Sequence, residues 1–533
     1  AAMPPRGAGD SPAGSSLRPL FWPRLAGQAN RLPHLGRAGV SASALLAMLA
    51  FASAALGAEQ AIPKHPKDLK FAPREFAPPR AADYRHKLAA GSTAFLVEDH
   101  EFPLVNISII VRTGDYLEPE GKEGLAQITG SQMRSGGTKS RPPEVFDEEA
   151  AFLAASIGSG ISDVSGAASL NCLTKNVDSG MALLIDMLRN PGFDARRLKL
   201  AKSQILQSME RRNASTQSIE AREFNRLMRG TKHFTTAEIT KASLEAISQE
   251  DMIAFHDRYY YPSNFVIAVS GDFKTKDMLA MLDKAFADWP NRTEAIPAVP
   301  KPNFTPKPGV YVVDKKDVNQ GRVRMGHLGV QISNPDHLAL SVMNGMLGGN
   351  AFASRIVERV RSDEGLAYSS GSSFTAGTYY EGTFVAGFQS KSPSVAQATA
   401  IVLEEIERIR SSPVSAEELA NAKNYAMEGM PQRFSTAAHK ASQFANDYYT
   451  KLPEDYWQKY RQRISTVTVQ DIQRVARTYL HPDKLVILAV GDVDTMLRGN
   501  PDRPQYSIAK IAGNSAPMRI PLPDPLTMVY PSQ

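Results

Sequence analysis

The chain has 533 residues, of which 42% are hydrophobic and 22% charged. This length exceeds one ordinary core and predicts two to four domains of a globular protein. The formal net charge is +6, but residues 1–37 alone hold five arginines and one aspartate. The rest of the chain is therefore nearly neutral, which argues against a nucleic-acid-binding protein. A single cysteine, Cys172, excludes an internal disulfide and a cysteine-rich metal site.

The first 58 residues have the pattern of a secretory signal peptide. The basic residues 1–37 precede an uncharged apolar segment, residues 38–58, that ends in small residues. This order predicts cleavage after Ala58, or after Ala55, and a periplasmic or secreted protein. An uncleaved membrane anchor is the competing interpretation, although this Ala- and Ser-rich segment is barely long enough to span a bilayer. After signal removal the sequence predicts no membrane span.

The next segments predict an extended arm and then a sheet. Residues 59–83 are rich in proline and lysine, which is typical of an extended arm. Residues 84–97 alternate well enough for a hairpin with its turn near Gly91, and residues 105–111 read as a buried strand.

The chain contains an internal copy of one of its own segments. Residues 251–272 and 471–492 align without a gap at an offset of 220. The matched positions are Asp251 and Asp471, Tyr259 and Tyr479, Pro262 and Pro482, and the Gly-Asp pairs at 271–272 and 491–492. Each copy predicts a helix, a proline-containing turn and an apolar strand. A duplicated α+β unit of about 200 residues explains this pattern.

Proline-rich segments predict where the duplicated halves end. Residues 290–308 contain six prolines, a density typical of a semi-rigid spacer. We therefore expect an N-terminal half over 84–289, a linker over 290–308 and a C-terminal half over 309–499. Residues 500–533 are again proline-rich and aperiodic, and predict a tail.

One stretch of the C-terminal half combines a helix pattern with charged residues. Phe352, Ile356 and Val360 recur every four residues and predict an amphipathic helix. Arg355 and Arg359 are expected on its solvated face.

The ends of this helix are also marked. Gly348 and Gly349 predict a turn before it, with Asn350 as the N-cap. Gly365 stands where a helix end needs a left-handed residue, and residues 367–374 predict a strand.

Arg361 and Tyr368 lie on either side of this predicted corner. They are seven positions apart, so the corner can direct a permanent cation and a phenol toward one point. The plainer alternative is an exposed arginine and a half-buried packing tyrosine.

The stretch LGGNAFASRIVERVRSDEGLAYSSGSSF resembles the C-terminal-half signature of the insulinase/pitrilysin family of zinc peptidases. The hairpin segment and the helix–strand segment resemble the same family, so that the resemblance covers about residues 84–495. It implies an α+β fold of two duplicated α/β-sandwich halves, with antiparallel or mixed sheets covered by helices, facing each other like a clamshell around a peptide chamber. It also implies that Arg361 and Tyr368 contact the bound peptide.

The zinc motif of that family is absent. Family peptidases carry H-x-x-E-H on a helix, which supplies two zinc ligands and a general base. Here Gln127 and Ser131 replace the histidines, and Gly130 replaces the glutamate. The third ligand would fall near residues 207–208, where the adjacent Glu210 is off register. No two of the ten histidines are three, four or five residues apart, so the sequence predicts no metal or other cofactor in this chain.

The resemblance offers a precedent for such a chain. Some family enzymes consist of two chains, one with the zinc helix and one without it. We therefore expect a zinc-less subunit of a heterodimeric metallopeptidase, inactive alone, whose partner carries the zinc. Arg361 and Tyr368 would contact the peptide substrate beside that zinc.

Two further interpretations stay open. The chain could instead be a stand-alone pseudo-peptidase that binds peptides or acts as a scaffold. A peptidase with a rebuilt metal site is disfavoured by the histidine spacing. His256 and His327 are expected to be structural, and Tyr259 and Tyr479 to serve packing.

Overall fold

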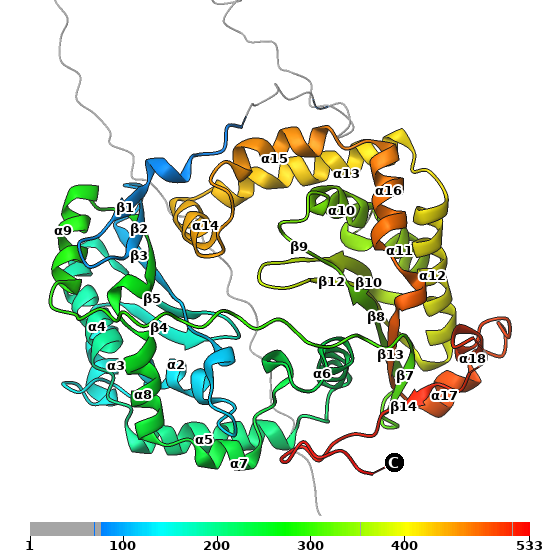
Figure 1. Cartoon of the computed structure of the whole chain (residues 1–533), viewed down its shortest axis with the longest axis horizontal. Coiled ribbons are helices and arrows are strands. Elements are labelled where there is room, and N and C mark those ends of the chain that lie inside the picture. Colours follow the sequence, from blue (N-terminus) through cyan, green and yellow to red (C-terminus); the bar gives the residue numbers. More distant parts are fainter. Residues whose placement is uncertain (1–68, 70–75, 352, 514, 533) are drawn as a thin grey trace, which may run out of the picture. The chain divides into compact units, whose positions relative to one another are not determined.

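The computed structural model describes residues 69, 76–351, 353–513 and 515–532. The predicted signal peptide, both cleavage positions, most of the arm and Phe352 lie outside the described residues. Within these residues no helix has both the length and the apolarity needed to cross a bilayer. Residues 76–533 form one compact unit, shown in Figure 1.

The N-terminal half is built on a six-stranded mixed sheet of order β1-β2-β6-β3-β5-β4. Only β2 and β6 pair in parallel, and the other neighbours are antiparallel. The strands are β1 (Arg85–Lys87), β2 (Thr93–Glu98), β3 (Leu104–Val111), β4 (Ser156–Ile161), β5 (Gly166–Leu173) and β6 (Phe265–Gly271). The predicted hairpin is β1–β2, and Gly91 in its turn has φ = 96°.

The C-terminal half repeats this plan with the order β10-β12-β8-β13-β7-β14. Here β13 and β7 pair in parallel, as β6 and β2 do. The strands are β7 (Gly309–Asp314), β8 (Gln320–Leu328), β10 (Ala367–Phe374), β12 (Thr383–Lys391), β13 (Val486–Gly491) and β14 (Met518–Arg519), with a separate parallel pair β9 (Val330–Gln331) and β11 (Ala376–Gly377). Two mixed sheets covered by helices confirm the predicted fold class.

Helices make up most of the remaining structure. Those of the N-terminal half are α2 (Leu125–Ser135), α3 (Pro143–Phe152), α4 (Val177–Arg189), α5 (Ala195–Glu210), α6 (Thr216–Arg229), α7 (Lys241–Ala246), α8 (Gln249–Tyr259) and α9 (Thr275–Phe286). Those that follow are α10 (His337–Asn344), α11 (Arg355–Val357), α12 (Val395–Ser411), α13 (Ala416–Gly429), α14 (Ala437–Tyr449), α15 (Tyr456–Ser465), α16 (Val469–Tyr479), α17 (Val493–Arg498) and α18 (Ile508–Ile511).

The duplicated segments form the same local structure. Helices α8 and α16 each begin with a capping box, in which Asp251 and Asp471 occupy the third helical position. The strand after each helix ends in the matched glycine. At Gly271 φ is 124°, and a Cβ atom there would overlap the carbonyl oxygen of Leu104. The residues that match between the two copies thus determine where the helix begins and where the strand ends.

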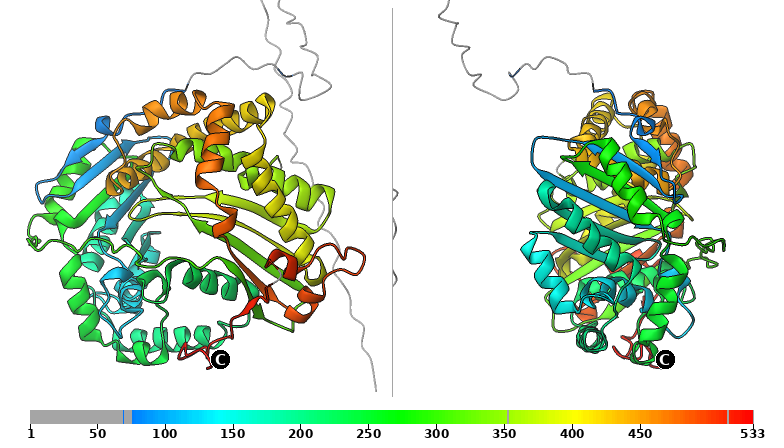
Figure 2. Two further views of the ribbon diagram at one scale, coloured as in Figure 1. Left: turned by 45° about the vertical axis from the view of Figure 1, so that its right-hand side comes forward. Right: turned by 90° about the vertical axis from the view of Figure 1, so that its left-hand side faces the viewer.

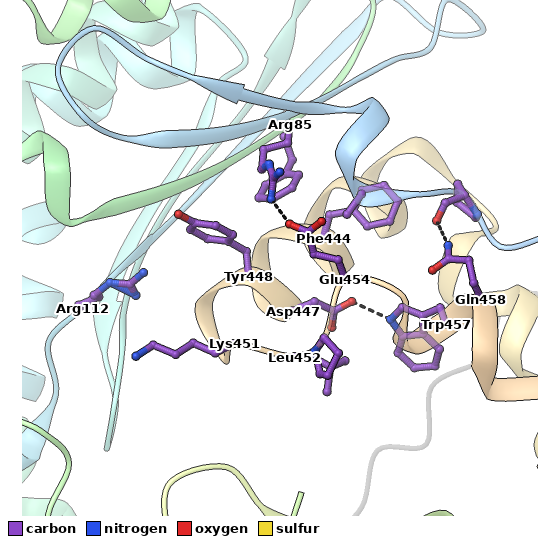
Figure 3. A pocket seen from close by; sticks show the side chains of 14 residues that line it. Arg85, Arg112, Phe444, Asp447, Tyr448, Lys451, Leu452, Glu454, Trp457 and Gln458 are labelled. Atoms are coloured by element: carbon purple, nitrogen blue, oxygen red, sulfur yellow. Dashed lines mark hydrogen bonds and ion pairs between the residues drawn. The ribbon is translucent and has the colours of Figure 1, made fainter. Parts of the chain in front are cut away.

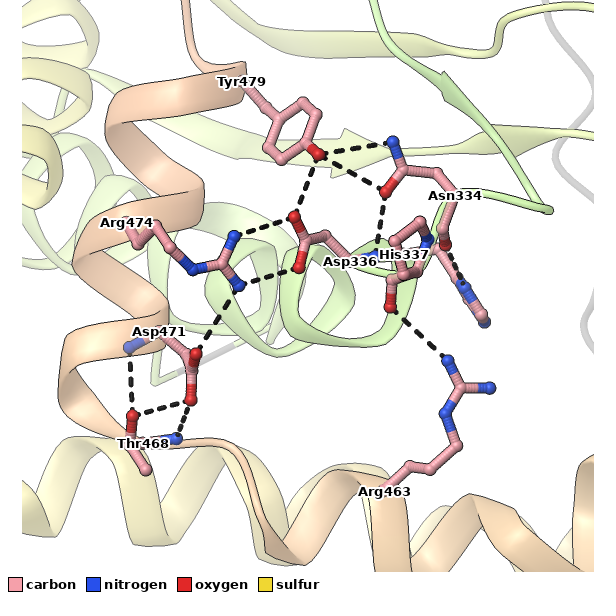
Figure 4. A network of polar contacts seen from close by, with 9 residues as sticks. Asn334, Asp336, His337, Arg463, Thr468, Asp471, Arg474 and Tyr479 are labelled. Carbon is pink, nitrogen blue, oxygen red and sulfur yellow. Dashed lines mark hydrogen bonds and ion pairs between the residues drawn. The ribbon is translucent and has the colours of Figure 1, made fainter.

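Polar contacts fix α16 against the start of α10 (Figure 4). The Arg474 guanidinium donates to both carboxylate oxygens of Asp336, at 2.8 and 2.7 Å. The Tyr479 hydroxyl donates to the same carboxylate at 2.9 Å. Its counterpart Tyr259 instead packs against Phe255, with ring centres 4.8 Å apart. The packing role predicted for both tyrosines therefore holds for Tyr259 and is incomplete for Tyr479.

One helix of each half packs on the sheet of the other half. Helix α14, from the C-terminal half, packs on β6 and β2 of the N-terminal half. Alternate strand residues Phe95, Val97, Val266 and Ala268 meet it, while their neighbours face the half's own helices. In Figure 1 α14 lies beside the blue strands of that sheet, and Figure 2 shows the arrangement from two further sides.

Helix α6 makes the reciprocal contact. It belongs to the N-terminal half but packs on β13 and β8 of the C-terminal half. Its Ile219, Phe224 and Met228 join a cluster with alternate residues of β7 and β13. Because α6 and α14 are about 220 residues apart, the offset of the repeat, the exchanged helices are equivalent copies.

The last residues of the chain connect the two halves. Strand β14 adds to the edge of the C-terminal sheet beside β7. Farther on, the backbone nitrogen of Lys241 donates to the Leu526 carbonyl at 2.8 Å. The Tyr530 hydroxyl donates to the carboxylate of Glu223 on α6, at 2.8 and 2.9 Å. These contacts attach the tail to α6 and α7, and the tail residues Ile520 and Leu522 pack against the same cluster that docks α6.

Candidate functional site

The corner that carries Arg361 and Tyr368 joins a helix to β10. Helix α11 continues as a π-helical segment, Glu358–Asp363, whose Val360 is fully buried. Gly365 follows with φ = 60°, as predicted, and the Leu366 nitrogen donates to the Val360 carbonyl at 2.9 Å. The chain therefore reverses tightly and enters β10 at Ala367.

This corner brings the two predicted site residues together. The guanidinium carbon of Arg361 lies 4.9 Å from the centre of the Tyr368 ring, a cation–π contact. Tyr368 is nevertheless 86% exposed. The exposed Tyr368 hydroxyl can donate a hydrogen bond to a bound molecule, and the adjacent guanidinium can stabilise negative charge on it.

The neighbouring arginines have a different function from the one predicted. Arg355 is not on a solvated face: its side chain is 11% exposed and forms a two-point ion pair with Glu418 on α13, at 2.7 and 2.8 Å. Arg359 pairs with the buried Glu405 on α12 at 2.8 Å. These two pairs fix the helix to its neighbours, so that Arg361 starts from a rigid support.

The start of the helix also differs from the prediction. Ser354, not Asn350, is the N-cap of α11, and its hydroxyl donates to the Asn350 carbonyl at 2.7 Å. Gly348 and Gly349 belong to a preceding π-helical segment, Gly345–Gly349, rather than to a simple turn. A Cβ atom at Gly348 would lie 2.5 Å from the Ser372 nitrogen of β10, so close packing explains this glycine.

The positions of the lost zinc motif lie on α2. Gln127 and Ser131 are exposed, and the Ser131 hydroxyl donates to the Ile128 carbonyl at 3.0 Å. Gly130 is buried where α2 packs on β4. A Cβ atom there would overlap the Ile161 backbone nitrogen and lie 2.7 Å from the carbonyl carbon of Gly160. No glutamate fits at this position without moving the strand.

A zinc ion does not fit the residues present. An amide, a glycine and a hydroxyl offer neither the imidazoles nor the carboxylate that zinc prefers. Among the described residues no group of three His, Cys, Asp or Glu side chains is arranged to hold a metal.

A cavity of about 330 Å³ lies beside the degenerate motif. It is lined by Gln127 and by Ser208 of α5, one of the positions where the third ligand was expected. Glu118, which no sequence pattern marks, lines the same cavity and accepts hydrogen bonds from the Gly124 and Ala126 nitrogens, at 3.1 and 2.7 Å. Glu118 thus caps the N-terminus of α2 from a distance, which no local capping pattern reveals.

Two acids of this cavity, Asp115 and Glu118, have raised pKa values. Burial raises the pKa of Glu118 to about 7, and the nearby Asp115 adds to this shift. Burial, together with the charge of Asp163, raises the pKa of Asp115 to about 6. One Asp115 oxygen is buried without a hydrogen-bond partner among the described residues. Burial thus favours the protonated form of both carboxyl groups.

The two histidines predicted to be structural are buried and hydrogen-bonded. The His256 Nε2 lies 2.8 Å from the Leu188 carbonyl oxygen. The His327 Nδ1 lies 2.8 Å from the Leu328 carbonyl oxygen, and its Nε2 accepts from the His481 nitrogen at 3.1 Å. Burial lowers the pKa of both imidazoles.

Two family models match the chain in succession. Residues 94–241 match the model described as insulinase (peptidase family M16). Residues 246–425 match the model described as peptidase M16 inactive domain.

Individual relatives and structures are similar over most of the chain. The Helicobacter pylori protein named non-peptidase homolog YmxG is 24% identical over 400 residues, covering 74% of this chain and 90% of that protein. A probable mitochondrial-processing peptidase subunit beta from Arabidopsis thaliana is 21% identical, covering 73% and 75%. The crystal structure of a peptidase M16 inactive domain from Pseudomonas fluorescens aligns with a TM-score of 0.68 at 23% identity, covering 76% and 97%.

Proposed function

The chain belongs to the insulinase family, peptidase family M16, and we propose that it is the zinc-less subunit of a two-chain peptidase of this family. In this proposal the partner subunit carries the zinc. The present chain supplies peptide binding and the Arg361–Tyr368 pair, and it does not cleave peptides alone.

One observation carries this proposal. Arg361 and Tyr368 are in contact, and Tyr368 is exposed. At Gly130, by contrast, the backbone of Gly160 and Ile161 occupies the space that the side chain of a catalytic glutamate needs. The relatives agree with such a division, since one is named a non-peptidase homolog and another a subunit of a processing peptidase.

The geometry defines what the pair does. Arg361 keeps its charge at every relevant pH and offers planar donors, and Tyr368 adds a hydroxyl donor beside it. Together they hydrogen-bond the carbonyl region of the peptide next to the partner's metal. There they orient the scissile bond and stabilise the negative charge that develops on it.

We also propose that the chain is exported to the periplasm or secreted. The basic leader followed by an uncharged apolar segment supports this location. N-terminal sequencing of the mature protein should then begin near Glu59. An intact leader recovered in the membrane fraction would contradict it.

The first experiment measures zinc content and peptide cleavage of the purified mature chain, alone and with the protein that copurifies with it. We expect neither zinc nor cleavage alone, and both in the complex. Stoichiometric zinc with chelator-sensitive cleavage by the single chain would overturn the proposal.

Two substitutions test the pair itself. Arg361→Ala and Tyr368→Phe should each lower turnover by the complex about 100-fold, as loss of a charge-stabilising donor does, and leave assembly intact. Tyr425→Phe, at another exposed tyrosine of the same half, is the matched control and should change nothing. Unchanged turnover in both test variants would remove the catalytic role.

The second candidate is a stand-alone pseudo-peptidase that binds peptides or serves as a scaffold. The match to an inactive domain and the relative named a non-peptidase homolog favour this function, because neither name implies a partner subunit. A zinc-free chain that binds peptides, forms no complex with a peptidase subunit and shows no cleavage would select this function instead.

A further inference from the structure

A second cavity, of about 320 Å³, lies where the exchanged helix α14 meets the N-terminal sheet (Figure 3). Phe95 of β2 and Arg112, just after β3, contribute from the sheet side. Tyr448, Lys451 and Trp457 contribute from α14, α15 and their connection. The cavity therefore belongs to both halves and is remote in sequence from the Arg361–Tyr368 corner.

The floor of this cavity is aromatic. The Phe95 ring centre lies 6.2 Å from that of Phe444 and 5.8 Å from that of Tyr448. Trp457 forms the opposite wall. Such a surface accepts a large apolar group.

The acidic side chains of the cavity are already paired. Glu454 forms an ion pair with Arg85. Asp447 accepts hydrogen bonds from the Trp457 indole and from Gln443, each at 2.7 Å. Glu454 is thus neutralised by Arg85, whereas Asp447 is held by neutral donors and burial raises its pKa, which favours its uncharged form.

Two cations of the cavity lack such partners. Among the described residues, neither Arg112 nor Lys451 has a carboxylate within ion-pair distance, and Arg112 only stacks over the Tyr449 ring at 5.2 Å. Figure 3 shows both charged groups on the side of the cavity away from Trp457. The cavity thus has one cationic end and one aromatic end.

The backbone at Lys451 supports a function for its side chain. Lys451 follows the C-terminus of α14 with φ = 58°, a left-handed conformation that favours glycine. The turn is closed by the Leu452 nitrogen, which donates to the Asp447 carbonyl at 2.9 Å. A lysine at a position suited to glycine carries a backbone cost, which a binding role for its ammonium group would explain.

We infer that this cavity binds the free C-terminal residue of a peptide with a large apolar side chain. Arg112 and Lys451 receive the carboxylate, and the rings of Phe95, Tyr448 and Trp457 receive the side chain. The volume suits one such residue with its backbone rather than a longer segment. The choice of a peptide as the source of the carboxylate rests on the proposed function, but the site needs neither partner nor zinc.

The test is a binding titration of the mature single chain with a fluorescently labelled tetrapeptide that ends in phenylalanine. The same peptide with a C-terminal amide and N-acetylphenylalanine are the comparison ligands. We expect the free acid to bind at least tenfold more tightly than the amide, and more weakly as salt is added. We also expect N-acetylphenylalanine, which has the same terminal residue, to bind within a few-fold of the tetrapeptide, because the cavity takes only that residue.

Two substitutions locate the site. Arg112→Gln and Lys451→Gly should each weaken binding of the free acid at least tenfold and abolish its advantage over the amide. Lys451→Gly should also raise the melting temperature, because glycine relieves the left-handed backbone. Lys459→Met, at an exposed lysine on α15, is the control and should bind as the unchanged chain does.

Three results would overturn the inference: equal affinity for acid and amide, no binding of either, or full binding by Lys451→Gly. Binding of N-acetylphenylalanine at least tenfold weaker than that of the tetrapeptide would overturn a site for the terminal residue alone. Because this assay contains no partner, its failure leaves the test of Arg361 and Tyr368 untouched.

Discussion

The exchanged helices α6 and α14 occupy equivalent positions but are held by different chemistry. Helix α14 is held by rings: Phe444 lies 5.4 Å from Tyr84 and 6.2 Å from Phe95, centre to centre. Helix α6 adds a buried carboxylate, Glu220, which accepts hydrogen bonds from Arg322 and Arg324 at 3.0 and 3.3 Å. Duplication thus preserved where a helix docks, while the contacts that dock it diverged.

The cavities beside the first core helix of each half differ in the same way. The cavity at α2 is lined by four acids, Asp115, Glu118, Glu123 and Glu238. The cavity at α10 and α13, about 280 Å³, has Asn344, Tyr425 and Arg433 but no acid among its described lining residues. The cavity at α2 thus contains two acids with raised pKa values, Asp115 and Glu118, and the cavity at α10 and α13 contains no acid among its described lining residues.

Removing the most deeply buried ring of α14 should have the largest effect. Phe444 is 1% exposed and touches rings from both halves, so Phe444→Ala should cost about 3–5 kcal/mol through lost burial and a cavity. The shift in the urea unfolding midpoint measures it. Phe152→Ala, at a residue 88% exposed, is the control, and equal shifts would show that α14 is not held by its rings.

Removing the buried carboxylate of α6 should have the next largest effect. Glu220→Ala leaves two partly buried arginines without their shared partner and should cost about 2–3 kcal/mol. Arg322 keeps a hydrogen bond to Gln389, which limits the loss. Glu210→Ala, on an exposed face, is the matched control. A value within the control's error would mean that apolar contacts alone dock α6.

Stability should depend on pH through the N-terminal cavity. Because folding raises the pKa of Glu118 to about 7, the folded state binds this proton more tightly than the unfolded state. Its contribution is complete below the unfolded pKa and is lost as pH rises through 7. Glu118→Gln should flatten the decline in melting temperature between pH 5 and 8, which corresponds to roughly 2 kcal/mol. Glu120→Gln, at an exposed residue, is the control and should leave the decline of melting temperature with pH unchanged. If Glu118→Gln also leaves this decline unchanged, a group other than Glu118 causes it.

The tail contact at α6 should have the smallest effect. Tyr530→Phe removes one hydroxyl that donates to buried Glu223 and should cost about 1 kcal/mol in thermal or urea unfolding. Tyr425→Phe, which removes an exposed hydroxyl, provides the baseline. A loss as large as that of Glu220→Ala would mean that the tail, rather than the sheet, is the main support of α6.

Local patterns predicted the elements and the signature corner. The helix and strand of each repeat and the left-handed Gly365 depend on neighbours a few residues away, so the sequence could locate them. The seven-residue spacing likewise placed Arg361 near Tyr368, although their part in catalysis stays a prediction.

Features that depend on distant partners could not be predicted in this way. The sequence predicted Arg355 and Arg359 on a solvated face because the glutamates that pair with them lie 63 and 46 positions away. An amphipathic helix such as α6 shows which face it buries but not which sheet will cover it. Glu118 caps α2 across a loop, so no spacing rule marks it.

The helix exchange has a consequence for synthesis of the chain. When the N-terminal half has left the ribosome, one face of its sheet, with Phe95 and Val97, still lacks α14, which is made more than a hundred residues later. Until then that apolar face is exposed to other chains and invites aggregation. The N-terminal sheet is therefore fully covered only after residues 437–449 have been synthesised.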